Sequence, residues 1–252
     1  MKIRIQLEGV PLESVEALVA GLPDDALASP WRSTVPLIEY WRQQSSLEAL
    51  WKSLDVPAPS SAVLAFEHPT PVRAGTGKAS FTDLMIISDS LAVAVEAKFT
   101  EPRYETVAEW LGPAPTDNRV KVLRGWLQYI HEATGRELSF DEVRRLPYQV
   151  VHRTASVCAI ARPARAVVYQ VYSTPIPGYY EQDLGELFDL LAPAGKLSGW
   201  VHGCTVAPSP EYRALMEQWE QGKRALQAEV RDLLSTGRAM SVASASLKCV
   251  SE

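Results

Sequence analysis

The hydrophobic positions of this chain follow two spacings, and each spacing predicts a different kind of secondary structure. Apolar residues that alternate with polar ones, or that run together over about four to eight positions, indicate strands. Apolar residues three and four positions apart indicate helices with one buried face. We therefore expect strands over 1–8, 62–67, 80–87, 91–99, 164–173 and 199–206, and helices over 12–22, 35–54, 104–111, 118–134, 148–161, 184–191 and 209–234. Strands and helices mixed in this way predict an α/β protein.

The order of these segments predicts how the sheet is built. Only Ser88-Asp89-Ser90 separates the strands 80–87 and 91–99, and such a short polar link is typical of a turn between adjacent strands. Helices lie between residue 99 and the strand 164–173, as a parallel or mixed pairing requires. We therefore expect a mixed central sheet flanked by helices, whose core contains a helix, a three-strand meander, a helix and a strand.

The chain divides into a core with additions at both ends. Residues 34–175 form the expected core, and residues 1–33 precede it as a strand and helix extension. Residues 176–240 are expected to add a strand and a long helix that pack on the core. Residues 241–252 are small and polar, and we predict that they are disordered.

Charged residues interrupt two of the apolar strands at positions where burial is expected. Asp83 lies within the strand 80–87, whereas Glu96 and Lys98 end the strand 91–99 and point to the same face, because side chains alternate along a strand. Burying two carboxylates and an ammonium group without a use for them would cost several kcal/mol. A divalent metal between the carboxylates, with the lysine beside it, would offset that cost and make a hydrolytic site. The alternative is a solvated end of a hairpin.

An aspartate followed after a gap by Glu96-Ala97-Lys98 at a strand end resembles the PD-(D/E)XK nuclease superfamily, which has the restriction-endonuclease-like fold. The resemblance covers roughly residues 34–175, and Thr82 stands where the family often has a proline before the aspartate. It implies hydrolysis of phosphodiester bonds with Mg²⁺, or Mn²⁺ as a substitute, held by Asp83, Glu96 and the backbone carbonyl of Ala97. Lys98 would then orient the attacking water or stabilise charge on the phosphate.

Other polar residues are candidates for the metal or the substrate, and the sequence leaves them open. Either Glu67, at the end of a strand, or Glu39, on the first core helix, could add a further carboxylate to the metal. The candidates for contact with the substrate are Lys78, Lys121, Arg124, Gln149, His152 and Arg153. Among these we favour Arg153, because a guanidinium group can bind phosphate through two hydrogen bonds. For each candidate, a solvated surface position is the competing interpretation.

Composition limits the location and the partners. The 252 residues contain no run of about 18 apolar residues, so no transmembrane helix or membrane partner is expected. The three cysteines are far apart and are interpreted as free thiols, which predicts a reducing, cytoplasmic location. The net charge of −5 argues against general attraction to nucleic acid, although residues 73–165 carry 13 Lys+Arg against 11 Asp+Glu. We therefore expect recruitment by a second subunit, as in a homodimer, or by a protein partner.

The sequence thus predicts a metal-dependent nuclease that acts on DNA, and the resemblance suggests a role in prokaryotic defence or in mobile elements. Two alternatives stay open. One is a nuclease directed at RNA. The other is a catalytically silent module that scaffolds a complex through its long C-terminal helix.

Overall fold

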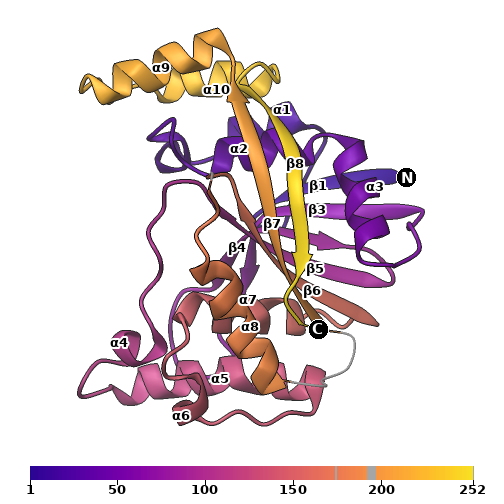
Figure 1. Cartoon of the computed structure of the whole chain (residues 1–252), viewed down its shortest axis with the longest axis vertical. Helices are drawn as coiled ribbons and strands as arrows, with labels where there is room; N and C mark the ends of the chain where they lie inside the picture. Colours follow the sequence, from indigo (N-terminus) through magenta and orange to yellow (C-terminus); the bar gives the residue numbers. More distant parts are fainter. Residues whose placement is uncertain (174, 192–196, 252) are drawn as a thin grey trace.

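A mixed sheet runs through the whole molecule, as the computed structural model shows for residues 1–173, 175–191 and 197–251 (Figure 1). Its strands are β1 (Lys2–Leu7), β2 (Val10–Leu12), β3 (Ser61–Thr70), β4 (Ser80–Ile87), β5 (Leu91–Lys98), β6 (Ala164–Val171), β7 (Leu197–Pro208) and β8 (Met240–Cys249). They are arranged in the order β2-β1-β3-β4-β5-β6-β7-β8. The strands β3, β4 and β5 form an antiparallel meander, and β5, β6 and β7 run parallel to one another. The expected α/β class and mixed sheet are confirmed.

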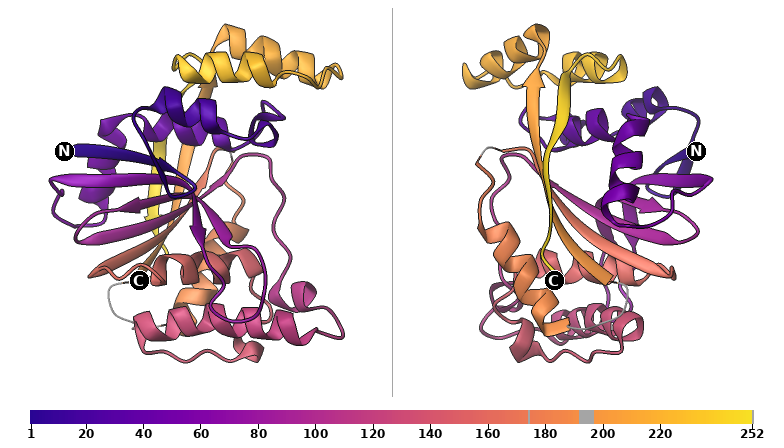
Figure 2. Two further views of the ribbon diagram at one scale, coloured as in Figure 1. Left: turned by 180° about the vertical axis from the view of Figure 1, so that it is seen from behind. Right: turned by 45° about the vertical axis from the view of Figure 1, so that its right-hand side comes forward.

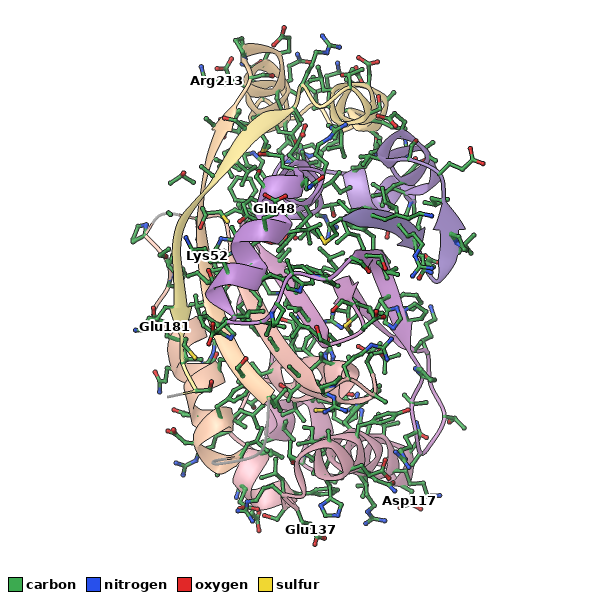
Figure 3. The ribbon with its side chains drawn as sticks, turned by 90° about the vertical axis from the view of Figure 1, so that its right-hand side faces the viewer. Glu48, Lys52, Asp117, Glu137, Glu181 and Arg213 are labelled. Carbon is green, nitrogen blue, oxygen red and sulfur yellow. The ribbon has the colours of Figure 1, made fainter. Side chains whose placement is uncertain are left out.

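Helices cover both faces of this sheet (Figure 2). The helices on one face are α1 (Val15–Gly21), α2 (Thr34–Trp41), α3 (Gln44–Ser53), α9 (Pro210–Glu220) and α10 (Gln227–Ser235), with a 3-10 turn at Asp24–Leu27. The helices on the other face are α4 (Val107–Leu111), α5 (Asp117–Thr134), α6 (Phe140–Val143), α7 (Tyr148–Cys158) and α8 (Tyr179–Leu191). In the view of Figure 3, α9 with Arg213 lies at one end of the molecule, and α5 with Asp117 lies at the other. No helix in these residue ranges is long and apolar enough to cross a membrane.

The alternation of side chains along β5 explains why α7 is the helix that reaches the expected site. Val93 and Val95 point to the face that carries α2 and α3, whereas Ala92 and Ala94 point to the α7 face. Small alanine side chains let α7 approach the sheet closely, and every residue of α7 is buried. The polar residues of this helix therefore cannot form a solvated surface, which removes that interpretation for Gln149, His152 and Arg153.

Three predictions, one in the expected core and two towards the C-terminus, are wrong. The expected helix over 35–54 is two helices, because Gln43 has an extended backbone and the hydroxyl of Ser46 donates to the carbonyl of Tyr40. The long C-terminal helix also ends early, at Glu220, and Gly222 follows with a positive φ of 99°. The segment 241–252, expected to be disordered, contains most of β8, which pairs with β7 from Met240 to Cys249. The serines and alanines of β8 take up strand geometry because β7 offers a partner along its whole length.

Candidate active site

The register of β3, β4 and β5 places three carboxylates in one row. Pairing of β4 with β5 ends at Leu84 and Val95, so Asp83 and Glu96 are next across from each other. Glu67 lies opposite Asp83 on the other side of β4, because the residues on either side of Glu67 pair with the residues on either side of Asp83. All three acids point to the α7 face, because the residues two positions away from them pack in the cluster on that face.

The regular sheet opens at this row of acids. Instead of a ladder bond between β4 and β5, the Oδ2 atom of Asp83 accepts a hydrogen bond of 2.7 Å from the backbone amide of Ala97. Glu67 has a positive φ of 47°, which is uncommon for a residue with a side chain. The pairing of β4 with β5 therefore ends where Asp83 and Glu96 stand, and the hydrogen bond brings Asp83 next to the Glu96-Ala97-Lys98 segment. The strands β3 and β4 stay paired beyond Glu67.

Glu96 is the most enclosed member of the row, with 2% of its surface exposed. Its Oε1 atom accepts hydrogen bonds from the side-chain amide of Gln149 at 2.6 Å and from the ammonium group of Lys98 at 3.0 Å. Its Oε2 atom accepts from Nε of Arg153. Gln149 and Arg153 are four residues apart on α7, so one helix face supplies both donors. The Nη1 atom of Arg153 continues to the hydroxyl groups of Ser80 and Thr82 on β4.

The electrostatics differ sharply along the row. Although burial alone would raise it, Arg153 and Lys98 lower the pKa of Glu96 to about 2, so this residue is ionised. Burial, together with the nearby charge of Glu96, raises the pKa of Asp83 well above its usual range. Burial also raises the pKa of Glu67 to about 7, against the attraction of Arg153. The positive charge near Asp83 and Glu67 is therefore too small to stabilise both of them as ionised carboxylates.

A cavity of about 590 Å³, here called the acidic cavity, opens beside these residues. Its acidic lining residues are Glu8, Asp25, Glu67, Asp83, Glu96 and Glu101, and its basic ones are Arg32, Lys78 and Lys98. Two of the acids come from the N-terminal segment that the sequence placed outside the core. Glu8 has a positive φ of 51° and precedes Gly9, as in a turn. The glycine indicates a turn in the sequence, but it does not indicate that the turn lies beside the acidic cavity.

The structure brings some of the other candidates to the cavity and leaves others away from it. Lys78 lies at the rim, and Glu67 lies in the row, whereas Glu39 is bound elsewhere. The carboxylate of Glu39 accepts from the backbone amide of Ala239 at 3.1 Å and from Arg42 at 3.3 Å, which ties α2 to the start of β8. The sequence leaves both Glu39 and Glu67 open as a further carboxylate for a metal, and the geometry favours Glu67.

The two basic candidates on α5 are not part of this site. Lys121 and Arg124 are both exposed, and Arg124 lines a separate hollow with His131 and Glu137. His152, by contrast, is buried, and its Nδ1 atom is 3.0 Å from the hydroxyl oxygen of Ser80. Burial, and then the neighbouring Arg153, hold the pKa of His152 well below its usual range, so the ring is neutral. Ser80, which contacts both His152 and Arg153, carried no signal in the sequence that distinguishes it from other serines.

The fold and the site define an α/β protein with a buried carboxylate–guanidinium cluster where its central sheet opens. The chain belongs to the family DUF6946, described as a domain of unknown function, whose model matches residues 11–208. Comparisons with curated proteins and with solved structures find no match. The matched segment contains Glu67, Asp83, Glu96, Lys98 and Arg153, and it ends with the last residue of β7.

Proposed function

We propose that this protein is a metal-dependent nuclease of the PD-(D/E)XK type that hydrolyses phosphodiester bonds in DNA. The observation that carries the proposal is the placement of Asp83, Glu96 and Lys98 around one opening of the sheet, at the edge of the acidic cavity. The meander of β3, β4 and β5, followed by helices and the parallel strand β6, is the arrangement that a restriction-endonuclease-like core requires.

The chemistry of the donors fits Mg²⁺. Carboxylate and carbonyl oxygens are the ligands that this ion prefers, and Asp83, Glu96, Glu67 and Ala97 all line the acidic cavity. Among residues 1–173, 175–191 and 197–251, no group of three or more His, Cys, Asp or Glu has the geometry of a formed metal site. Glu96 would thus have to exchange one of its present donors for the ion. When bound, Mg²⁺ would polarise the phosphate and acidify a water molecule.

The other residues of the site would act on the substrate and on the carboxylates. Lys98 is 6% exposed, and the acids Glu96 and Asp83 raise its pKa although burial opposes this, so it stays protonated. Its ammonium group can therefore stabilise negative charge that develops on the phosphate. The sequence favours Arg153 as a phosphate contact, but in the structure its guanidinium group is bound to Glu96 and β4. We assign to it the orientation of Glu96.

A cleavage assay tests the proposal on plasmid DNA, single-stranded DNA and RNA, each with Mg²⁺, Mn²⁺ or EDTA. We expect cleavage that needs the metal and that Asp83→Asn, Glu96→Gln and Lys98→Met each abolish. The matched controls are Glu48→Gln and Lys52→Met, two exposed positions on α3 (Figure 3), a helix that packs on the face of the sheet opposite α7. Cleavage by purified Asp83→Asn at the rate of the unchanged protein would refute the assignment.

One observation favours a second candidate, a nuclease-like module without activity. Both oxygens of Glu96 are held by donors of the protein itself, as in a purely structural ion pair. Isothermal titration with Mn²⁺ separates the two candidates. Heat of binding that Asp83→Asn removes supports the nuclease, whereas no binding at millimolar Mn²⁺ supports the silent module.

A further inference from the structure

A second cavity, of about 480 Å³, lies beside the first half of α7 and shares Lys78 and Phe81 with the acidic cavity. We call it the aromatic cavity, because Phe81, Tyr104, Trp110, Trp126 and Tyr148 line it. Gln149 and Arg153, which hold Glu96, also line it from α7. The two cavities are therefore neighbours that meet at the start of β4, where they share Lys78 and Phe81.

Two of the rings that line this cavity are accessible. Trp110 and Tyr148 stack on each other, with ring centres 4.0 Å apart and planes 6° from parallel, and Tyr148 and Trp126 are buried, so these rings form the wall. Tyr104 is 43% exposed and Phe81 is 37% exposed, which is unusual for large aromatic side chains away from a binding surface. Such surfaces suit a flat, unsaturated ligand that stacks.

The charge of the aromatic cavity is opposite to that of the acidic cavity. Lys78, Arg119 and Arg153 line it, and none of its lining residues is Asp or Glu. An aromatic cage for a cationic ligand would contain no such cations, because they repel it. Arg153 is paired with Glu96, so Lys78 and Arg119 are the cations that can meet a ligand. Together with the exposed rings of Tyr104 and Phe81 they favour an anion that carries a flat ring, and a nucleotide is such an anion.

The wall of the aromatic cavity formed by residues 71–79 is fixed in place. This segment connects β3 to β4 and descends to α5 (Figure 2). The side chain of Asn118 accepts from the backbone amide of Thr76 at 2.7 Å and donates to its carbonyl oxygen at 2.7 Å. A Cβ atom on Gly125 would lie 2.9 Å from the backbone nitrogen of Ala74, so a glycine is needed where the segment crosses the helix. The cavity is thus largely preformed.

We propose that the aromatic cavity binds one unpaired nucleotide of the substrate strand, with its base stacked on the rings and its phosphate at Lys78 and Arg119. This inference rests on the proposed nuclease function and names its substrate class. A base inside a duplex cannot enter such a cavity without leaving the stack. The strand next to the bound nucleotide would pass Lys78 toward Asp83 and Glu96. The preferred substrate is therefore single-stranded or carries an unpaired end.

Fluorescence anisotropy of labelled oligonucleotides tests this with the whole 252-residue chain in EDTA, where cleavage does not interfere. A single strand should bind more tightly than a blunt hairpin of the same length. Tyr104→Leu should weaken binding of the single strand by between about fivefold and about 140-fold, the range for loss of one stacked base, whereas Tyr104→Phe should retain it. Arg119→Met should also weaken binding, and Arg213→Met, an exposed arginine on α9, should not.

The outcomes separate this inference from the nuclease proposal. Oligonucleotide binding that depends on Tyr104, without cleavage in the presence of Mg²⁺ or Mn²⁺, would support nucleotide binding in the aromatic cavity and refute the nuclease proposal. Equal binding of hairpin and single strand, both insensitive to Tyr104→Leu, would overturn the inference even if cleavage depends on Asp83. Competition with dAMP and dTMP distinguishes the source of the nucleotide. Binding of either mononucleotide more tightly than the single strand would overturn the assignment to a substrate strand.

Discussion

Glu67→Gln should stabilise this protein in metal-free buffer at alkaline pH. The carboxylate of Glu67 lies in the row with Asp83 and Glu96, and burial raises its pKa to about 7 from an ordinary value of 4.5. Ionisation of Glu67 is therefore less favourable in the folded protein than in the unfolded chain. Glutamine has nearly the same size and carries no charge, so the substitution removes this cost and leaves the packing unchanged.

The expected magnitude follows from the displaced pKa. A difference of about 2.5 pH units corresponds to about 3 kcal/mol at about 1.4 kcal/mol per unit, and the partial exposure of Glu67 reduces this to about 1–2 kcal/mol. Below pH 4.5 both states hold the proton, so the two proteins should be equally stable. As the pH rises from about 4.5 to about 7, the unfolded chain releases the proton first, and the unchanged protein loses stability relative to the variant.

Thermal unfolding of both proteins between pH 4 and pH 8 in EDTA measures this difference. We expect the melting temperature of the variant to be about 2–8 °C higher at pH 8, and equal at pH 4. Glu101→Gln is a matched control in the same cavity, with the opposite sign. The backbone amides of Phe99 and Ser33 lower the pKa of Glu101 although burial opposes them, so its loss should destabilise. A Glu67→Gln effect that is independent of pH would refute the reasoning.

Three further changes should have measurable effects. Arg153→Met leaves Glu96 buried without its main partner and should cost about 3–5 kcal/mol in urea unfolding; an unchanged midpoint would contradict the assigned ion pair. Gly125→Ala should displace the segment at Ala74, lower the melting temperature by a few degrees and weaken oligonucleotide binding. Deletion of residues 240–252 removes β8, exposes the edge of β7 and should cost roughly 3–6 kcal/mol from lost apolar burial alone, which circular dichroism melting would detect.

The strands of the core could be predicted because burial leaves a plain pattern in the sequence. Continuous apolar runs identified β4, β5 and β6, and Ser88-Asp89-Ser90 identified the turn within the meander. Asp83 and Glu96 stood out for the same reason, since charge within such a run needs an explanation. That Asp83 and Glu96 lie close together follows from the turn alone, because a hairpin fixes which residues lie across from each other.

Features that depend on contacts distant in the chain could not be predicted. Glu39 and Glu67 were equal candidates, because only the sheet order and the register of β3 decide which one reaches the row. The pairing of Arg153 with Glu96 depends on how deeply α7 lies against the alanines of β5. The strand β8 has no hydrophobic period of its own, and it is ordered by hydrogen bonds to β7 rather than by its own composition.

The site is costly for the fold in ways that a purely structural cluster would avoid. Asp83 and Glu67 are held where their ionisation is unfavourable, and Glu67 also has a strained backbone. Apolar residues of similar volume would fill a buried position at least as stably as an ion pair. Because the row lies at the rim of a cavity of its own charge and beside one of opposite charge, binding of a cation and of an anionic strand would relieve both imbalances together. If the proposed function holds, the two cavities therefore act as one site.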